Sequence, residues 1–87
     1  MSRPLLKELY LGAAEMIKDP SKWTWDYEDL DDKVCALGAI YRVGSERGLS
    51  RPDFRKIVRD HFIITTINDF LGRKAVIVYL RFRASRL

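Results

Sequence analysis

The chain of 87 residues has one cysteine and one histidine, which leaves few side chains of the kinds that build catalytic or metal sites. A single cysteine, Cys35, cannot form an intrachain disulfide. It also excludes a zinc site of the kind that several cysteines build. No glycine-rich phosphate-binding loop is present. Nowhere do roughly 18 apolar residues run together, so we expect no membrane span and a cytoplasmic location. These absences predict a protein without metal or cofactor.

Cys35 and His61 form the only conceivable nucleophile and base. No third group that would orient the histidine is evident, and such a group is what makes this pairing catalytic in other proteins. Cys35 lies in an apolar, small-residue stretch that is typical of a core position. We therefore expect no enzyme and no catalytic residue.

Charge is distributed unevenly along the chain. Residues 1–50 carry seven Lys or Arg against nine Asp or Glu, whereas residues 51–87 carry nine against three, a net charge of +6. Five of the seven residues from Asp26 to Asp32 are acidic. Such segregation bears on association rather than on fold, and it predicts a charged partner or a second copy of the chain.

The periodicity of apolar residues predicts a mainly α, compact four-helix single domain over residues 1–87. The first helix follows Ser2 and Pro4 and ends at Asp19-Pro20, because the residue before proline avoids the helical region. The second runs from about Lys33 to Arg47, with Gly48 in the left-handed position after it. Asp31 or Asp32 is its expected N-cap.

The second half of the chain is harder to assign. Phe54, Ile57, Val58 and His61 share one side of a predicted third helix that starts near Ser50. The β-branched residues 62–67 disfavour a helix, and 68–72 read as a loop. Residues 63–67 either pair with 23–27 as a short two-stranded β patch or form a buried connector. Residues 73–85 are expected to be a buried helix, with a C-terminal strand and an α+β fold as the alternative.

Gly44, Gly48 and the Leu49-Ser50 pair follow the spacing of a helix-turn-helix. The turn glycine allows a positive φ, and a small residue at 44 lets two helices approach. In this interpretation the phosphate backbone or base edges of DNA would be met by four basic side chains, Arg51, Arg55, Lys56 and Arg59. A plain helical corner has the same glycine requirement and is the competing interpretation.

The acidic segment lies beside alternating aromatics, with Trp23 expected inside and Trp25 at the rim. As a surface for another protein it would use Trp25, Tyr27, Asp29 and Asp31, since aromatic side chains dominate binding hot spots. As a helix-capping cluster it would need no partner. Its spacing does not fit a calcium-binding loop.

Three features occur in order along the chain: Trp23, then Cys35-Ala36-Leu37-Gly38-Ala39-Ile40, then Asn68-Asp69 before a last apolar helix. This pattern resembles a family of small uncharacterised proteins of actinobacteria and their phages, with a W…C-A-x-G-A-[LI]…W-N-D pattern. The resemblance implies a shared fold and a phage-like context but no reaction. Small residues at 36, 38 and 39 suit close helix packing, and Asn68 and Asp69 suit capping of the last helix. If the family pattern marks a site, we expect it where Asn68-Asp69 approaches Trp23.

Together these features predict a small non-enzymatic binding protein of phage or mobile-element type that docks onto a host protein. The acidic segment with Trp25 and Tyr27 is one candidate surface, and the basic C-terminal helix is the other. The alternatives are a helix-turn-helix DNA-binding regulator and a homodimeric structural protein whose acidic and basic faces join two copies.

Overall fold

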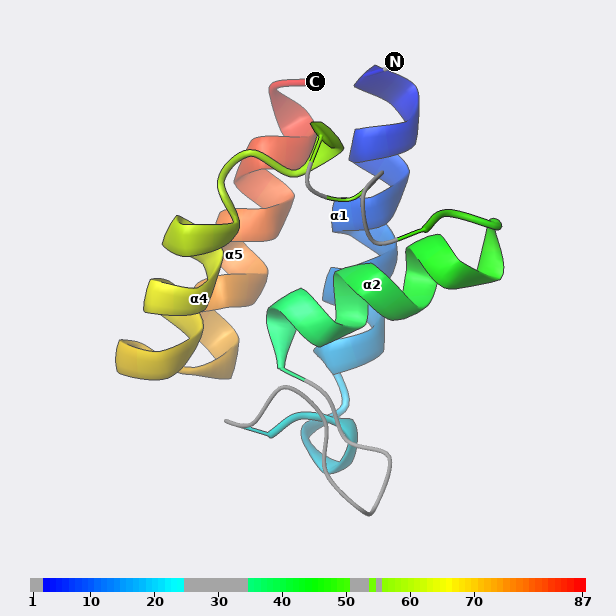
Figure 1. The fold of residues 1–87 in the computed structure, drawn as a ribbon. Helices are drawn as coiled ribbons and strands as arrows, with labels where there is room; N and C mark the ends of the chain where they lie inside the picture. Colours follow the sequence, from blue (N-terminus) through cyan, green and yellow to red (C-terminus); the bar gives the residue numbers. More distant parts are fainter. Residues whose placement is uncertain (1–2, 25–34, 51–53, 55) are drawn as a thin grey trace.

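The first helix, α1 (Arg3–Ile17), packs against two other helices of the fold, α2 (Ala36–Glu46) and α5 (Arg73–Ser85). The computed structural model describes residues 3–24, 35–50, 54 and 56–87. A fourth helix, α4 (His61–Phe70), packs against α5 and α2, and a short 3-10 helix, η1, spans Pro20–Lys22. α5 runs antiparallel to both α1 and α4, while α2 crosses α1 (Figure 1). The expected compact, mainly α fold of four helices is confirmed for the described residues.

The start and end of α1 follow from the sequence as expected. Leu9, Ala13 and Ile17 recur at helical spacing and are fully buried. The helix ends before Asp19-Pro20. Arg73 caps the C-terminal end of α1 with its side chain, since its Nη1 donates a hydrogen bond to the Lys18 carbonyl oxygen at 2.8 Å. A cation bonded to carbonyl groups at a helix C-terminus is favoured by the helix dipole.

The second helix begins later than expected. Its N-cap is Cys35, whose Sγ accepts a hydrogen bond from the Gly38 N–H at 3.4 Å. The prediction that Asp31 or Asp32 caps this helix is therefore wrong, because a buried thiol takes that position. Both aspartates lie outside the described residues, as do Trp25, Tyr27 and Asp29.

The turn after α2 has the predicted glycine requirements. Gly48 has a φ of +82°, which only glycine adopts without strain. A Cβ at Gly44 would lie 2.2 Å from Cζ of Phe54, whose ring is buried. Tyr41 packs on the same ring edge to face, with ring centroids 4.5 Å apart. Gly44 thus permits the close approach that the sequence predicted.

The third helical segment ends earlier than expected. Phe54, Lys56 and Ile57 are helical, but Val58 is not, and Arg59 and Asp60 form a turn. Phe54, Ile57 and Val58 are buried as predicted. His61 does not continue that side, because it is exposed and opens α4.

Residues 62–67 are helical, so the prediction of a strand or connector there is wrong. The loop predicted over 68–72 is confirmed only for Leu71 and Gly72, because the helix continues to Phe70. Ile64 and Asn68 lie four residues apart on the buried side of α4, and this packing outweighs the weak β preference of the segment. The hydroxyl of Thr66 donates a hydrogen bond to the Phe62 carbonyl oxygen at 2.8 Å, so this polar group has its partner within the same helix. The β patch with 23–27 is excluded for the same reason.

The last helix spans Arg73–Ser85 as predicted, so the alternative C-terminal strand is also excluded. Val76, Leu80 and Ala84 form its buried side. Gly72, with a φ of +94°, allows the tight reversal from α4 into α5. No helix in the part of the chain that the structure describes has the length and hydrophobicity to cross a membrane.

Candidate functional site

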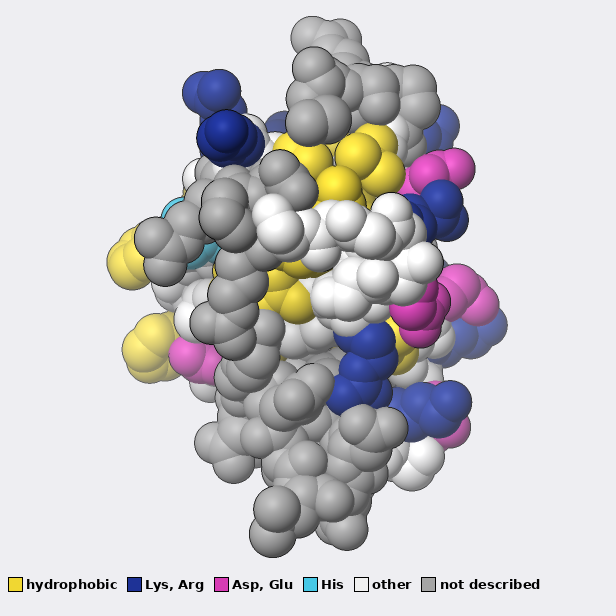
Figure 2. All heavy atoms as spheres, turned by 45° about the vertical axis from the view of Figure 1, so that its right-hand side comes forward, with side chains coloured by type: hydrophobic (Ala, Val, Ile, Leu, Met, Phe, Trp, Pro, Cys, Tyr) yellow, Lys and Arg dark blue, Asp and Glu magenta, His cyan; other side chains and the backbone are white. Residues whose placement is uncertain are grey.

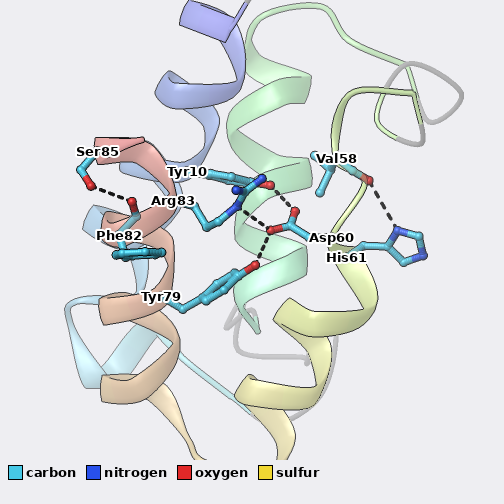
Figure 3. A network of polar contacts seen from close by, with 8 residues as sticks. All are labelled: Tyr10, Val58, Asp60, His61, Tyr79, Phe82, Arg83 and Ser85. Atoms are coloured by element: carbon cyan, nitrogen blue, oxygen red, sulfur yellow. Dashed lines mark hydrogen bonds and ion pairs between the residues drawn. The ribbon is translucent and has the colours of Figure 1, made fainter. Parts of the chain in front are cut away.

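The Asp60 carboxylate links three helices of the fold. Asp60, whose side chain is only 11% exposed, accepts hydrogen bonds from the hydroxyl of Tyr10 on α1 and from Tyr79 on α5, the latter at 2.6 Å. Arg83 Nε donates to the same carboxylate at 3.2 Å (Figure 3). Asp60 occupies the N-cap of α4 yet makes no cap hydrogen bond, because its oxygens are engaged by these side chains. This Asp60 network is therefore a structural link between α1, α4 and α5.

Both tyrosines of the network are held in the protonated form. Burial, the hydrogen bond to Asp60 and the charge of Asp60 raise the pKa of Tyr79 to about 12. The same causes, in the same order, raise the pKa of Tyr10 still further above its usual value. A donating hydroxyl that faces a carboxylate cannot lose its proton without placing two negative charges together.

The Asp60 network predicts a loss of stability at alkaline pH. Between pH 10 and about 12 the unfolded chain releases the Tyr10 proton while the folded chain keeps it, so the free energy of unfolding falls as pH rises. We expect a slope of about 1.4 kcal/mol per pH unit from Tyr10, with a smaller one from the more exposed Tyr79. Urea unfolding at several pH values measures it. Tyr10→Phe should remove the Tyr10 part of the slope, and an unchanged slope in that variant would contradict the assignment.

A second polar centre lies at Asn68, which is 1% exposed. Its Oδ1 accepts from Trp23 Nε1 at 2.9 Å and from the Ala36 N–H at 3.0 Å. The sequence predicted that Asn68 caps the last helix, and this prediction is wrong. Asn68 bonds the first turn of α2 instead, while Gly72 holds the N-cap of α5. The expected proximity of Trp23 and Asn68 is confirmed, and Trp23 is half-buried against the core.

Cys35 and His61, the only conceivable nucleophile and base, have different environments. Cys35 is buried, and burial raises the pKa of its thiol, which opposes formation of the reactive thiolate. His61 lies at the surface, beside a cavity of about 390 Å³ lined by Tyr41, Phe54, Val58 and His61. Its Nδ1 lies 3.4 Å from the Val58 carbonyl oxygen (Figure 3). Among the described residues no group of three potential metal ligands occurs.

The feature that the sequence missed is an exposed apolar surface on α4 and α5. Among the described residues, seven large hydrophobic side chains are exposed, and six of them belong to this helical hairpin. We call this set the α4–α5 outer face, and it consists of Phe62, Ile63, Phe70, Leu71, Val78 and Phe82. Phe70 is 81% exposed and Phe62 is 76% exposed.

The helical spacing explains why these side chains share one surface. Phe62 and Phe70 are eight residues apart on α4, and Val78 and Phe82 are four apart on α5, so each pair lies on one side of its helix. These sides are turned away from the buried residues of each helix, and α4 and α5 lie side by side (Figure 1). A helical wheel of residues 61–70 would have revealed the face, had that segment been assigned as a helix.

The remaining surface differs from this face. Figure 2 shows Lys and Arg side chains alternating with Asp and Glu along the right-hand edge, whereas hydrophobic side chains stand out at the left-hand edge. Glu8, for example, pairs with Arg47 at 2.9 Å across α1 and α2. Charged mixtures of this kind are ordinary protein surface, while a cluster of exposed aromatic and aliphatic side chains marks an interaction site.

Of the basic residues assigned to DNA, Lys56 and Arg59 are both exposed. Arg59 lies in the turn after the short helix rather than on it. Arg51 and Arg55 lie outside the described residues.

Comparison with known proteins adds no relative to this picture. No family model, no curated protein and no solved structure matches the chain. The resemblance to the small actinobacterial and phage family therefore stays a hypothesis. The residues that carry it do meet in space, since Trp23 and Ala36 both bond Asn68.

Proposed function

We propose that this protein is a small non-enzymatic binding protein that docks onto another protein through the α4–α5 outer face. The observation that carries the proposal is the exposure of six large hydrophobic side chains on one helical hairpin. Leaving this much apolar surface in water is unfavourable, and burying it on a partner supplies binding free energy. The face includes three phenylalanines, and aromatic side chains are enriched in protein interfaces.

The phage or mobile-element context belongs to the same proposal, with a host protein as partner. It is supported by the resemblance described above. The α4–α5 outer face shares Val78 and Phe82 with the basic C-terminal helix that the sequence offered as its second candidate surface. The first candidate, with Trp25, Tyr27, Asp29 and Asp31, lies outside the described residues and is not needed for the proposal.

Site-specific photocrosslinking in the native host tests the proposal. p-Benzoylphenylalanine placed at Phe70 lies on the face, whereas the same group at Leu11 on α1 is also exposed but lies off it. We expect a discrete covalent adduct with another protein from position 70 and none from position 11. Equal adducts at both positions, or none at either, would contradict docking through this face.

A DNA-binding regulator is the second candidate. The observation that favours it is the Gly44–Phe54 contact followed by the positive φ of Gly48, because a helix-turn-helix needs both features. It would use Lys56 and Arg59, together with Arg51 and Arg55. Binding of duplex DNA with a steep loss of affinity in salt, in a chain that crosslinks to no protein, would favour this candidate.

A further inference from the structure

We infer that the partner presents to the α4–α5 outer face an amphipathic helix whose apolar stripe is flanked by acidic side chains. This inference rests on the proposed function and specifies the chemistry of the partner. It depends on two properties of the hairpin, the charge around the apolar residues and the arrangement of those residues in two rows.

The charge around the face is strongly positive. Residues 61–87 contain five Lys or Arg and one Asp, a net charge of +4. Two of the cations are engaged inside the fold, since Arg73 bonds carbonyl groups at the end of α1 and Arg83 bonds Asp60. The other three are exposed, Lys74 and Arg81 on α5 and Arg86 at its C-cap.

One of these cations is held at the apolar surface itself. The guanidinium carbon of Arg86 lies 5.2 Å from the centre of the Phe82 ring, so a positive charge rests on part of the outer face. Arg81 lies 3.7 Å from Glu15 in a long and exposed ion pair, which neutralises it weakly. A partner that covers Phe82 therefore meets positive charge at the edge of its contact, and acidic side chains there are complementary.

The arrangement of the apolar residues suits a helix. Phe62 and Phe70 are separated along the axis of α4 by about 12 Å, or two turns, and Val78 and Phe82 lie on the adjacent antiparallel helix. Two rows of side chains on neighbouring helices form the surface on which a third helix packs in helical proteins. A partner helix with apolar residues at three- and four-residue spacing would contact both rows.

Charge also argues against a second copy as the occupant. A symmetric dimer through this face would bring Lys74, Arg81 and Arg86 of both chains together, and Asp69 is the one acidic residue that each hairpin offers in return. An anionic membrane would accept the cations, but it would face Asp69, which is exposed beside Phe70. A helix can place its acidic groups away from Asp69, whereas a lipid surface cannot.

Two matched synthetic peptides test the inference. Both are helical and carry the same leucine stripe, with Glu on both flanks in one and Lys in the other, and their binding is followed by fluorescence anisotropy. At low salt we expect the Glu-flanked peptide to bind at least tenfold more tightly, with the preference decreasing as salt is added. Lys74→Glu with Arg86→Glu should abolish the preference, and Phe70→Ser with Val78→Ser should abolish binding of both peptides. All four substituted residues are exposed, so we expect the variants to fold. Arg86 makes the contact with the Phe82 ring described above. Circular dichroism checks that each variant remains helical.

Other outcomes would overturn the inference in distinguishable ways. Equal affinity for both peptides would mean that the partner needs no acidic flanks, although the apolar docking face would stand. Tighter binding to vesicles that contain phosphatidylserine than to either peptide would assign the face to a membrane. A mass that doubles with concentration, and that reverts in Phe70→Ser, would assign it to a second copy. If neither peptide binds while position 70 still crosslinks a host protein, this inference fails and the proposed function stands.

Discussion

Replacing Asp60 with alanine should lower the free energy of unfolding by about 3–4 kcal/mol. The carboxylate accepts from two tyrosine hydroxyls and a guanidinium, and its loss would leave those donors without an acceptor. A buried donor without a partner costs about 1–3 kcal/mol, and Tyr10 is fully buried. A small domain has a total stability of about 5–15 kcal/mol, so this one substitution should remove a large part of it. Urea unfolding followed by circular dichroism measures the change.

Two controls separate the network from the general loss of a negative charge. Glu15→Ala removes a carboxylate whose ion pair with Arg81 is exposed, and it should cost less than about 0.5 kcal/mol. Asp60→Asn keeps one acceptor oxygen, and we expect a loss between those of the other two variants. A loss in Asp60→Ala as small as that in Glu15→Ala would show that the network does not hold α1, α4 and α5 together.

Local patterns in the sequence were sufficient for the helices whose periodicity and end signals agree. Pro4 and Asp19-Pro20 bracket α1, because proline fixes its own φ and disfavours the helical region for the residue before it. Gly48 marks the turn after α2, because glycine adopts a positive φ without strain. The last helix was also predicted correctly over Arg73–Ser85. The segment from Phe62 to Phe70 was not, since its β-branched residues indicate a strand locally while the buried contacts of Ile64 and Asn68 are made with distant elements.

The candidate sites depend more strongly on contacts distant in sequence. Tyr10 and Asp60 are 50 residues apart, and nothing in the spacing of either residue indicates that they meet. The α4–α5 outer face was missed as a consequence of the wrong assignment of residues 62–67, because exposed residues on a helix share a side only once the helix is known. The Cys35 cap was missed for a different reason, since cysteine is rarely an N-cap and the neighbouring aspartates are better ones.

Replacing Asn68 with alanine is the second large expected effect, about 2–4 kcal/mol. Its Oδ1 is the acceptor for the indole N–H of Trp23 and for the backbone N–H of Ala36, and the alanine variant would leave both without this partner and open a small cavity. The Ala36 group matters most, because the first N–H groups of a helix have no partner within the helix and Ala36 is fully buried. Asn68 thus connects Trp23, the start of α2 and the last turn of α4.

A double-mutant cycle with Trp23→Phe tests whether Asn68 acts through these hydrogen bonds. The phenylalanine ring keeps much of the apolar contact of Trp23 but has no N–H to donate. In the Trp23→Phe background, Asn68→Ala should cost at least about 0.5 kcal/mol less than in the natural sequence, because one of the two bonds is already absent. Strictly additive losses would mean that Trp23 and Asn68 are only neighbours. A coupled loss would establish that the residues of the family-like pattern stabilise one another, and would explain the pattern by folding rather than by a reaction.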